Sequence, residues 1–209
     1  MKKGNGEIAG LHDMNYPPWE RGVRQGGMLN EWVMQRNLIN FKKIMDKNDI
    51  PFVAIFGTLL GFVREGKPVI TSKDADFFCY AKDHYKMKSV INSLKSYGFH
   101  IVDRNDSPLG DHHIIRGGEK IEIWWFQKIN KEWVYDDRVR YEAKYFDNLQ
   151  TIKVLGKDWL IPDFAEENLL ITYGEDWEIP NPKATYILDA RKAKSIVEPI
   201  KEEDKGKKK

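Results

Sequence analysis

The sequence predicts an α+β protein, with a mixed β-sheet and helices packed mainly on one face of that sheet. Two observations lead to this prediction. Apolar residues recur at helical spacing near both ends of the chain, and between these regions lie several short runs rich in β-branched and aromatic residues. No internal repeat is visible. Helices at both ends of a chain with strands between them are typical of this fold class.

The first helix is predicted between residues 29 and 47. Four apolar residues recur there at spacings of four, three and four and therefore share one face: Met34, Leu38, Phe41 and Met45. A wholly apolar run at residues 52–56 predicts a short buried strand that ends at Gly57. The segment after Gly57 is compatible with a second helix, so the local order is strand, glycine turn, helix.

The next predicted elements are a strand over residues 67–80 and then a helix. Asp83 is suited to cap the beginning of this helix, and Gly98 to end it. Further along the chain, two β-rich runs flank Gly117 and Gly118, which supply the positive φ angles that a tight turn needs. This pattern predicts a β-hairpin.

The strand-rich middle of the chain continues up to the last helix. Three further segments have strand character: residues 100–104, 131–137 and 149–162. After them, Asp163 and Glu166 have the spacing of a capping box, and Gly174 follows the last apolar residue of the segment. We therefore predict a helix between Asp163 and Gly174.

A single domain is expected over residues 28–195, because a chain of 209 residues lies within the size range of one hydrophobic core. Residues 1–27 are rich in Gly and Pro and lack hydrophobic periodicity. Residues 196–209 form a charged segment of low complexity. We expect both segments to be flexible.

Charge, cysteine content and hydropathy disfavour several classes of protein. The chain has 34 Lys and Arg against 32 Asp and Glu, a net charge of +2, which is too balanced to indicate a nucleic-acid-binding protein. Its one cysteine, Cys79, cannot form an internal disulfide, and no apolar run approaches the roughly 20 residues that cross a bilayer. No secretory signal is recognisable. We expect a cytoplasmic protein without a transmembrane segment, associated at most peripherally with the inner face of the membrane.

The strongest local signal for chemistry is the pair Asp74 and Asp76 in the segment SKDADFF. Alternate residues of a strand share a face, so these carboxylates should project side by side. They repel each other unless a positive charge lies between them, and hard oxygen ligands suit Mg²⁺ or Mn²⁺ bound jointly to the phosphates of a substrate. Because an isolated pair of this kind is more often a solvated edge or turn, the metal interpretation depends on its surroundings.

Gly57 and Thr58 are the first of these surroundings. They end the predicted buried strand and open a helix, where free backbone N–H groups and a hydroxyl could hold a phosphate. The alternative is an ordinary strand-to-helix turn that uses glycine for its backbone freedom. Arg64, on the same short helix, could approach a phosphate or a neighbouring carboxylate, or could form a surface ion pair.

A complete metal site would need a third acid, and Glu122 is the candidate. It lies within an aromatic strand, where an unpaired charge is costly to bury. Glu122 would bind the metal or accept a proton from the acceptor; alternatively it lies on an open face beside Lys120 and has no role. His112 and His113 are adjacent in a strand and should point to opposite faces, so we interpret them as structural histidines.

Four segments occur in a fixed order over roughly residues 50–182. They are GTLLGFVREG, SKDADFF, KIEIWWF and IPDFAEENLLITYGEDWEIP. The last segment contains the group of residues that is least expected to recur in unrelated helices: Pro162, Tyr173, Gly174, Trp177 and Pro180. Together the segments resemble the LicD and fukutin family of phosphotransferases, which show G-T-x-L-G-x-x-R, D-x-D, an acidic residue in a hydrophobic strand, and V-P…Y-G-x-x-W-x-x-P.

The chain departs from the family pattern at two points, the first of which indicates the branch that it resembles. LicD proteins usually read D-D-D-x-D where this chain has Ser72, Lys73, Asp74, Ala75 and Asp76, so the chain is closer to the fukutin-like branch. The third acid of the family is commonly Asp and is Glu122 here.

The resemblance implies a nucleotidyltransferase fold and a Mg²⁺-dependent enzyme. Its activity would be transfer of a phospho-alcohol (phosphoribitol, phosphoglycerol or phosphocholine) from a CDP-activated donor to a hydroxyl of a glycan or glycolipid, with release of CMP. Such an enzyme would decorate a bacterial cell-surface polysaccharide. The resemblance places the metal on Asp74, Asp76 and Glu122. It assigns donor binding to four residues: Gly57, Thr58, Arg64 and Lys73.

Two alternatives remain open. The same acids would serve a nucleotidyltransferase that adds a nucleoside monophosphate from an NTP to a small molecule, a protein or RNA. The other alternative is a non-catalytic module that binds a glycan or a nucleotide. Metal-dependent turnover of a donor would exclude the second alternative.

Overall fold

The computed structural model describes residues 29–69, 72, 74–104, 111–135 and 139–180. The two segments predicted to be flexible, and the end of the predicted domain beyond residue 180, lie outside the described residues. Within them the chain forms a mixed sheet with the strand order β3-β4-β5-β2-β1-β9-β8, to which β6 adds through β5 and β7 through β6. The strands are β1 (Phe52–Ala54), β2 (Asp74–Tyr80), β3 (His100–Arg104), β4 (Asp111–Arg116), β5 (Glu119–Ile129), β6 (Glu132–Tyr135), β7 (Val139–Glu142), β8 (Leu149–Val154) and β9 (Lys157–Pro162).

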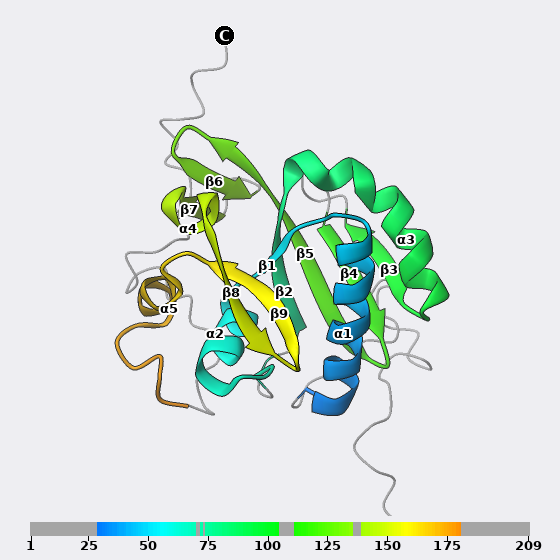
Figure 1. The fold of residues 1–209 in the computed structure, drawn as a ribbon, viewed down its shortest axis with the longest axis horizontal. Helices are drawn as coiled ribbons and strands as arrows, with labels where there is room; N and C mark the ends of the chain where they lie inside the picture. The colour runs from blue at the N-terminus through cyan, green and yellow to red at the C-terminus, as the bar shows by residue number, and fades with distance from the viewer. Residues whose placement is uncertain (1–28, 70–71, 73, 105–110, 136–138, 181–209) are drawn as a thin grey trace, which may run out of the picture.

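The helices belong mostly to one side of this sheet. They are α1 (Glu31–Lys47), α2 (Phe56–Glu65), the 3₁₀ helix η2 (Ala81–Lys86), α3 (Met87–Ser96), α4 (Lys144–Asp147) and α5 (Ala165–Tyr173). Figure 1 shows α1 and α3 lying over β3, β4 and β5, and both helices contact that part of the sheet. Apolar residues of α1, α2, α3 and α5 all join one hydrophobic core. The predicted fold class, α+β with a mixed sheet, is therefore confirmed.

On the face that is turned away from the helices, the central strands carry a second, aromatic core and, nearer the start of β2, the candidate site. Because side chains alternate along a strand, Phe77 and Cys79 of β2 join the helix-covered core, and Phe78 joins a second, aromatic core. The second core is closed by residues of β6, β7 and α4, including Tyr135, Tyr141 and Phe146. Asp74 and Asp76 lie on the same face of β2 as Phe78, nearer the start of the strand, and there the candidate site begins.

The pairing of β2 with β5 is parallel and places polar residues level with one another. Asp74 lies opposite Lys120, and Asp76 opposite Glu122. On the other side of β5, the antiparallel strand β4 places His113 opposite Glu122. Residues from three separate parts of the sequence therefore meet on one face of the sheet.

Several predicted elements are confirmed with small changes of boundary. The periodic segment forms α1, whose buried residues include all four of the predicted apolar positions. The glycine pair forms the turn between β4 and β5, with φ of 61° at Gly117 and 82° at Gly118. Gly174 ends α5 with a φ of 88°, as predicted.

The first two predicted strands are wrong in their boundaries. The strand predicted over residues 52–56 ends at Ala54, and α2 begins at Phe56, before Gly57. Phe56 itself has a φ of 48°, an unusual value for a bulky residue, and its ring contacts that of Trp124 at a centroid distance of 5.4 Å. The strand predicted over residues 67–80 begins only at Asp74 in the described chain.

Both helix caps predicted from aspartates are wrong. Asp83 lies inside η2, and its carboxylate pairs with Lys86 at 2.8 Å instead of capping α3. Asp163 does not form a capping box with Glu166, because Phe164 is the N-cap of α5 and makes no side-chain cap. The Asp163 carboxylate instead accepts a hydrogen bond from the side chain of Gln150 on β8 at 2.9 Å.

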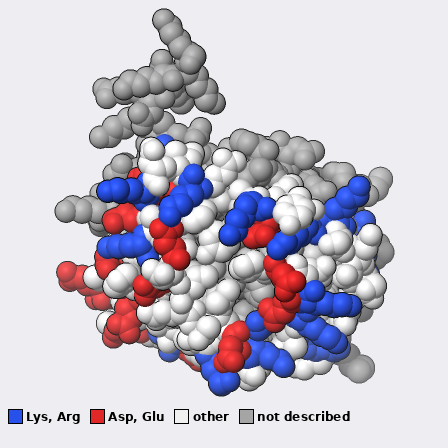
Figure 2. All heavy atoms as spheres, turned by 45° about the horizontal axis from the view of Figure 1, so that its top comes forward, with Lys and Arg blue, Asp and Glu red and all other residues white. Residues whose placement is uncertain are grey.

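The face displayed in Figure 2 is not dominated by one sign of charge. Figure 2 shows basic and acidic side chains next to one another on the displayed face, in keeping with the net charge of +2. Among the described helices, none combines the length and apolar character needed to cross a membrane.

Candidate functional site

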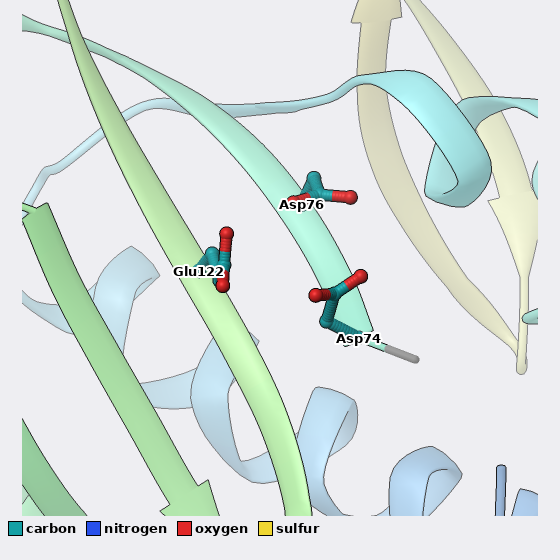
Figure 3. A group of neighbouring side chains, drawn as sticks. All are labelled: Asp74, Asp76 and Glu122. Carbon is teal, nitrogen blue, oxygen red and sulfur yellow. The ribbon is translucent and has the colours of Figure 1, made fainter. Parts of the chain in front are cut away.

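Three carboxylates converge where β2 and β5 run side by side. Asp74 and Asp76 extend from β2 and Glu122 from β5, and one carboxylate oxygen from each lies within 4.8 Å of the others. Figure 3 shows the three groups on the same side of the two strands. The spacing follows from the parallel register, which sets Asp76 level with Glu122. The structure therefore brings together the three acids that the sequence selects.

The cluster is short of positive charge. Burial raises the pKa of Asp76 well above its usual value, and the charges of Asp74 and Glu122 raise it further, against smaller opposing effects of Lys120 and Trp124. Burial also raises the pKa of Asp74, to which Glu122 adds and which Lys120 opposes. Asp76 is the buried member, whereas Asp74 and Glu122 are partly exposed. Such a set favours the arrival of a cation from the side of Asp74 and Glu122.

Lys120 contacts two of these acids and places a basic group beside them. It lies opposite Asp74 on β5, and its Nζ is 3.1 Å from Asp74 Oδ2 and also contacts Glu122 Oε1. Burial acts to lower the pKa of Lys120, but the charges of Glu122 and Asp74 outweigh it and leave the pKa above its usual value. Lys120 is therefore an ammonium. In the sequence, only its spacing of two residues from Glu122 indicates that they share a face.

Asp76 is held in place from two directions. Its side-chain Oδ1 accepts a hydrogen bond from Trp124 Nε1 at 3.2 Å. Its backbone N–H donates to Thr58 Oγ1 at 2.8 Å, and its carbonyl accepts from the N–H of Ile55 at 3.2 Å. The start of α2 is thus fastened directly to the strand that carries the two aspartates.

Thr58 does not present the free amide and outward-facing hydroxyl of the phosphate cradle considered for Gly57 and Thr58. Both are buried, the Thr58 amide donates to the carbonyl of Ile55 at 3.1 Å, and the Thr58 hydroxyl accepts from Asp76. The expectation of a free amide and an outward-facing hydroxyl at Thr58 is wrong, because α2 begins before these residues. Their contact with the donor remains a prediction, whereas the observed role of Thr58 is to position Asp76.

Arg64, another of the residues assigned to the donor, contacts groups other than the three acids. Arg64 Nη2 lies 2.5 Å from Glu65 Oε1, and its Nη1 donates to the carbonyl of Trp177 at 3.1 Å. Arg64 thus joins α2 to the segment that follows α5. Lys73 lies outside the described residues.

The two histidines point to opposite faces, as predicted. His112 lies on the helix-covered side, where its Nδ1 accepts from Trp125 Nε1 at 3.0 Å, in keeping with a structural role. His113 lies beside the carboxylates, with its Nε2 3.3 Å from Glu122 Oε1. No local pattern connects His113 with Glu122, because they meet only through the pairing of β4 with β5.

Thr58→Val is expected to lower the free energy of unfolding by about 1–3 kcal/mol, because it leaves the buried N–H of Asp76 without its acceptor. Urea denaturation followed by circular dichroism measures the change. Thr58→Ser keeps the hydroxyl and should be affected less. Equal stability of Thr58→Val and the wild type would show that the contact is unimportant.

Comparison with known proteins shows the fold of this chain. No protein-family model and no curated protein sequence matches it. The solution structure of the antibiotic-resistance factor ANT(2″)-Ia aligns with a TM-score of 0.51 and 11% sequence identity, over 74% of this chain and 78% of that chain. This similarity confirms the predicted nucleotidyltransferase fold.

Two further solved structures align less closely. The crystal structure of ANT(2″)-Ia in complex with adenylyl-2″-tobramycin has a TM-score of 0.48 and 10% identity, over 64% of this chain and 71% of that chain. A protein of Thermotoga maritima described as a nucleotidyltransferase has a TM-score of 0.43 and 15% identity, over 66% of this chain and 83% of that chain.

Proposed function

We propose that this chain is an enzyme that uses a divalent metal ion to transfer a phosphorus-containing group from a nucleotide-activated donor to a hydroxyl group. The convergence of Asp74, Asp76 and Glu122 carries the proposal, because three carboxylates within 4.8 Å of one another are the oxygen ligands that Mg²⁺ or Mn²⁺ prefers. The nucleotidyltransferase fold also supports the proposal, because a metal-dependent transfer would account for the three carboxylates that this fold brings together.

The residues present fit a metal ion. All three candidate ligands are carboxylates. Burial, and after it the charges of the neighbouring carboxylates, raise the pKa values of Asp74 and Asp76, and a bound cation would favour their ionised forms. When bound, Mg²⁺ would hold the donor's phosphates against the cluster and neutralise charge that develops during transfer.

The protein's own residues supply position and proton acceptance. Trp124 and Thr58 fix Asp76, so this ligand is in place before a substrate binds. Glu122 lies on a different strand from the two aspartates and contacts His113 and Lys120. It either completes the ligand set or accepts the proton of the attacking hydroxyl.

For the donor, we favour a CDP-activated phospho-alcohol and, for the acceptor, a glycan or glycolipid hydroxyl, as in the LicD and fukutin family. One contact supports treating the family-like segments as a unit. Arg64, at the end of the G-T-x-L-G-x-x-R segment, donates a hydrogen bond to the carbonyl of Trp177 in the Y-G-x-x-W segment. The helices α2 and α5, which carry these segments, also pack against each other. The product would be CMP.

The second candidate is transfer of a nucleoside monophosphate from an NTP, with release of pyrophosphate. The similarity in fold to ANT(2″)-Ia favours it, since that protein has been crystallised with an adenylylated aminoglycoside. The three carboxylates of this site suit either reaction, because both need charge neutralisation at a phosphate.

One assay separates the candidates. The purified protein is given Mg²⁺, a glycan mixture and an aminoglycoside panel, together with CTP, ATP, CDP-ribitol, CDP-glycerol or CDP-choline in separate reactions. We expect CMP from one of the CDP-alcohols. Pyrophosphate from CTP or ATP would instead establish nucleotidyl transfer, and the absence of any product, with or without Mg²⁺, would favour a non-catalytic binding module.

Trp124→Phe is expected to lower kcat/KM by about 10- to 150-fold, because it removes a hydrogen bond to a carboxylate that is ionised when it binds the metal, worth about 1.5–3 kcal/mol, but keeps an aromatic ring. Steady-state kinetics with the donor identified above measure the effect. Trp133→Phe is the matched control, since its indole donates to the exposed Asp147 at 3.0 Å. Equal kcat/KM in the two variants would contradict a positioning role for Trp124.

A further inference from the structure

We propose that Lys120 is a built-in counter-ion that the metal displaces: its ammonium holds Asp74 and Glu122 in the free protein and moves to the donor's phosphates when metal and donor bind. Metal and nucleotide would then bind cooperatively. The inference deepens the proposed function and rests on it, since it requires that the three carboxylates bind a metal.

The position of Lys120 is the first reason. Its Nζ contacts Glu122 Oε1 and lies 3.1 Å from Asp74 Oδ2, so it touches two of the three candidate ligands. The same Glu122 oxygen lies 3.3 Å from His113 Nε2. The third ligand, Asp76, is buried and is held by Trp124. An ion bound by all three carboxylates would therefore bind the two groups that Lys120 contacts and would compete with its ammonium for them.

The charge of the site is the second reason. Three carboxylates and one ammonium carry a formal charge of −2, which one divalent ion neutralises. The metal therefore removes the attraction that keeps the ammonium on the carboxylates. The donor's phosphates bring new negative charge to the same place. A lysine can follow this charge, because it has a flexible four-carbon stem and three donor hydrogens.

The consequence is an energetic coupling between the two ligands. Metal alone leaves the Lys120 ammonium, whose side chain is only 18% exposed, without its carboxylate partners. A bound phosphate supplies a new partner, so each ligand makes the other bind more tightly, and the effect is reciprocal. Coupling of this kind typically changes affinity by about 5- to 150-fold.

The first test measures binding of Mn²⁺ alone by electron paramagnetic resonance. Lys120→Met should bind Mn²⁺ at least about tenfold more tightly than the wild type, because the competing ammonium is gone. Lys128→Met is the matched control, since Lys128 lies on the same strand but pairs with Asp147 at 2.6 Å. Unchanged or weaker Mn²⁺ binding by Lys120→Met would overturn the inference.

The second test uses the wild-type chain and so does not depend on how a variant folds. Acetic anhydride labelling, located by mass spectrometry, reports the accessibility of the Lys120 amine. Labelling of Lys120 should increase with Mn²⁺ alone and fall again when CDP or ADP is added with Mn²⁺. A permanent ion pair would give the same labelling under all three conditions and would contradict the proposal.

The two tests also distinguish this inference from the proposed function. If neither the wild type nor Lys120→Met binds Mn²⁺, with or without CDP or ADP, the metal site itself is wrong and both proposals fail. If both bind Mn²⁺ equally well and Lys120 labelling never changes, the metal site stands and only the counter-ion role fails.

Discussion

Asp76→Asn should lower transferase activity by about a thousandfold or more. The same variant should leave the metal-free protein at least as stable as the wild type. The activity is lost because an amide cannot replace the negative charge of a metal ligand, and removal of a single electrostatic group from an active site already costs about 10²–10³-fold. Asp76 is also the buried and most firmly held member of the cluster.

The stability of the same variant follows from the pKa of Asp76. Burial raises this pKa well above its usual value, so the folded protein disfavours the ionised carboxylate. Without metal, stability should therefore fall as pH rises from the ordinary carboxyl range through the raised pKa. The asparagine of the variant has no charge to bury and can still accept from Trp124, so Asp76→Asn should lose much of this pH dependence.

Two measurements check these expectations. Donor turnover with Mg²⁺ gives the activity, and thermal unfolding in EDTA at several pH values gives the stability. Asp147→Asn is the control, because its carboxylate forms an exposed pair with Lys128. Activity of Asp76→Asn above a tenth of the wild-type value would contradict the metal assignment, and a loss of cooperative unfolding would contradict the stability argument.

Gly61→Ala is expected to destabilise the protein by about 3 kcal/mol. A Cβ at this position would lie 2.5 Å from the carbonyl oxygen of Lys67 and 2.7 Å from the amide nitrogen of Val69. Both atoms belong to the backbone, so neither can rotate away. The clash outweighs the gain of roughly 1 kcal/mol that alanine otherwise brings to a helix interior.

The substitution Gly61→Ala should also disturb the position of Asp76 in the candidate site. Gly61 lies in α2, the helix that Thr58 fastens to Asp76, and relief of the clash requires α2 or residues 67–69 to move. Urea denaturation measures the loss of stability. Gly66→Ala is the control, because a Cβ there meets no atom within 4 Å and only the φ of 65° opposes it, at about 1–2 kcal/mol. A smaller loss for Gly61→Ala than for Gly66→Ala would show that the contact relaxes easily.

Local patterns in the sequence were sufficient for much of the fold. The periodicity of α1 and the glycine pair of the β4–β5 turn are properties of neighbouring residues, and both predictions are confirmed. Alternation along a strand likewise placed Asp74 and Asp76 on one face. The link to the LicD and fukutin family rests on motifs alone and remains a prediction.

The errors arose where distant residues decide the local structure. Asp163 has the sequence of a cap, but its carboxylate bonds to Gln150 on another element. Phe56 adopts a positive φ, which no local pattern indicated, and its ring packs against Trp124. The position of Lys120 was equally unpredictable, since its contact with Asp74 exists only because β5 pairs with β2.

The register between β2 and β5 also limits which deletions and insertions the chain can tolerate in β5. Deletion of one residue early in β5 would turn Glu122 toward the helix-covered core and bring an isoleucine beside Asp76, since Ile121 and Ile123 flank the glutamate. Such a deletion should therefore inactivate the enzyme more surely than most substitutions. Descendants that keep the activity should preserve both the length of this strand before the third acid and the single residue that separates the acid from Trp124.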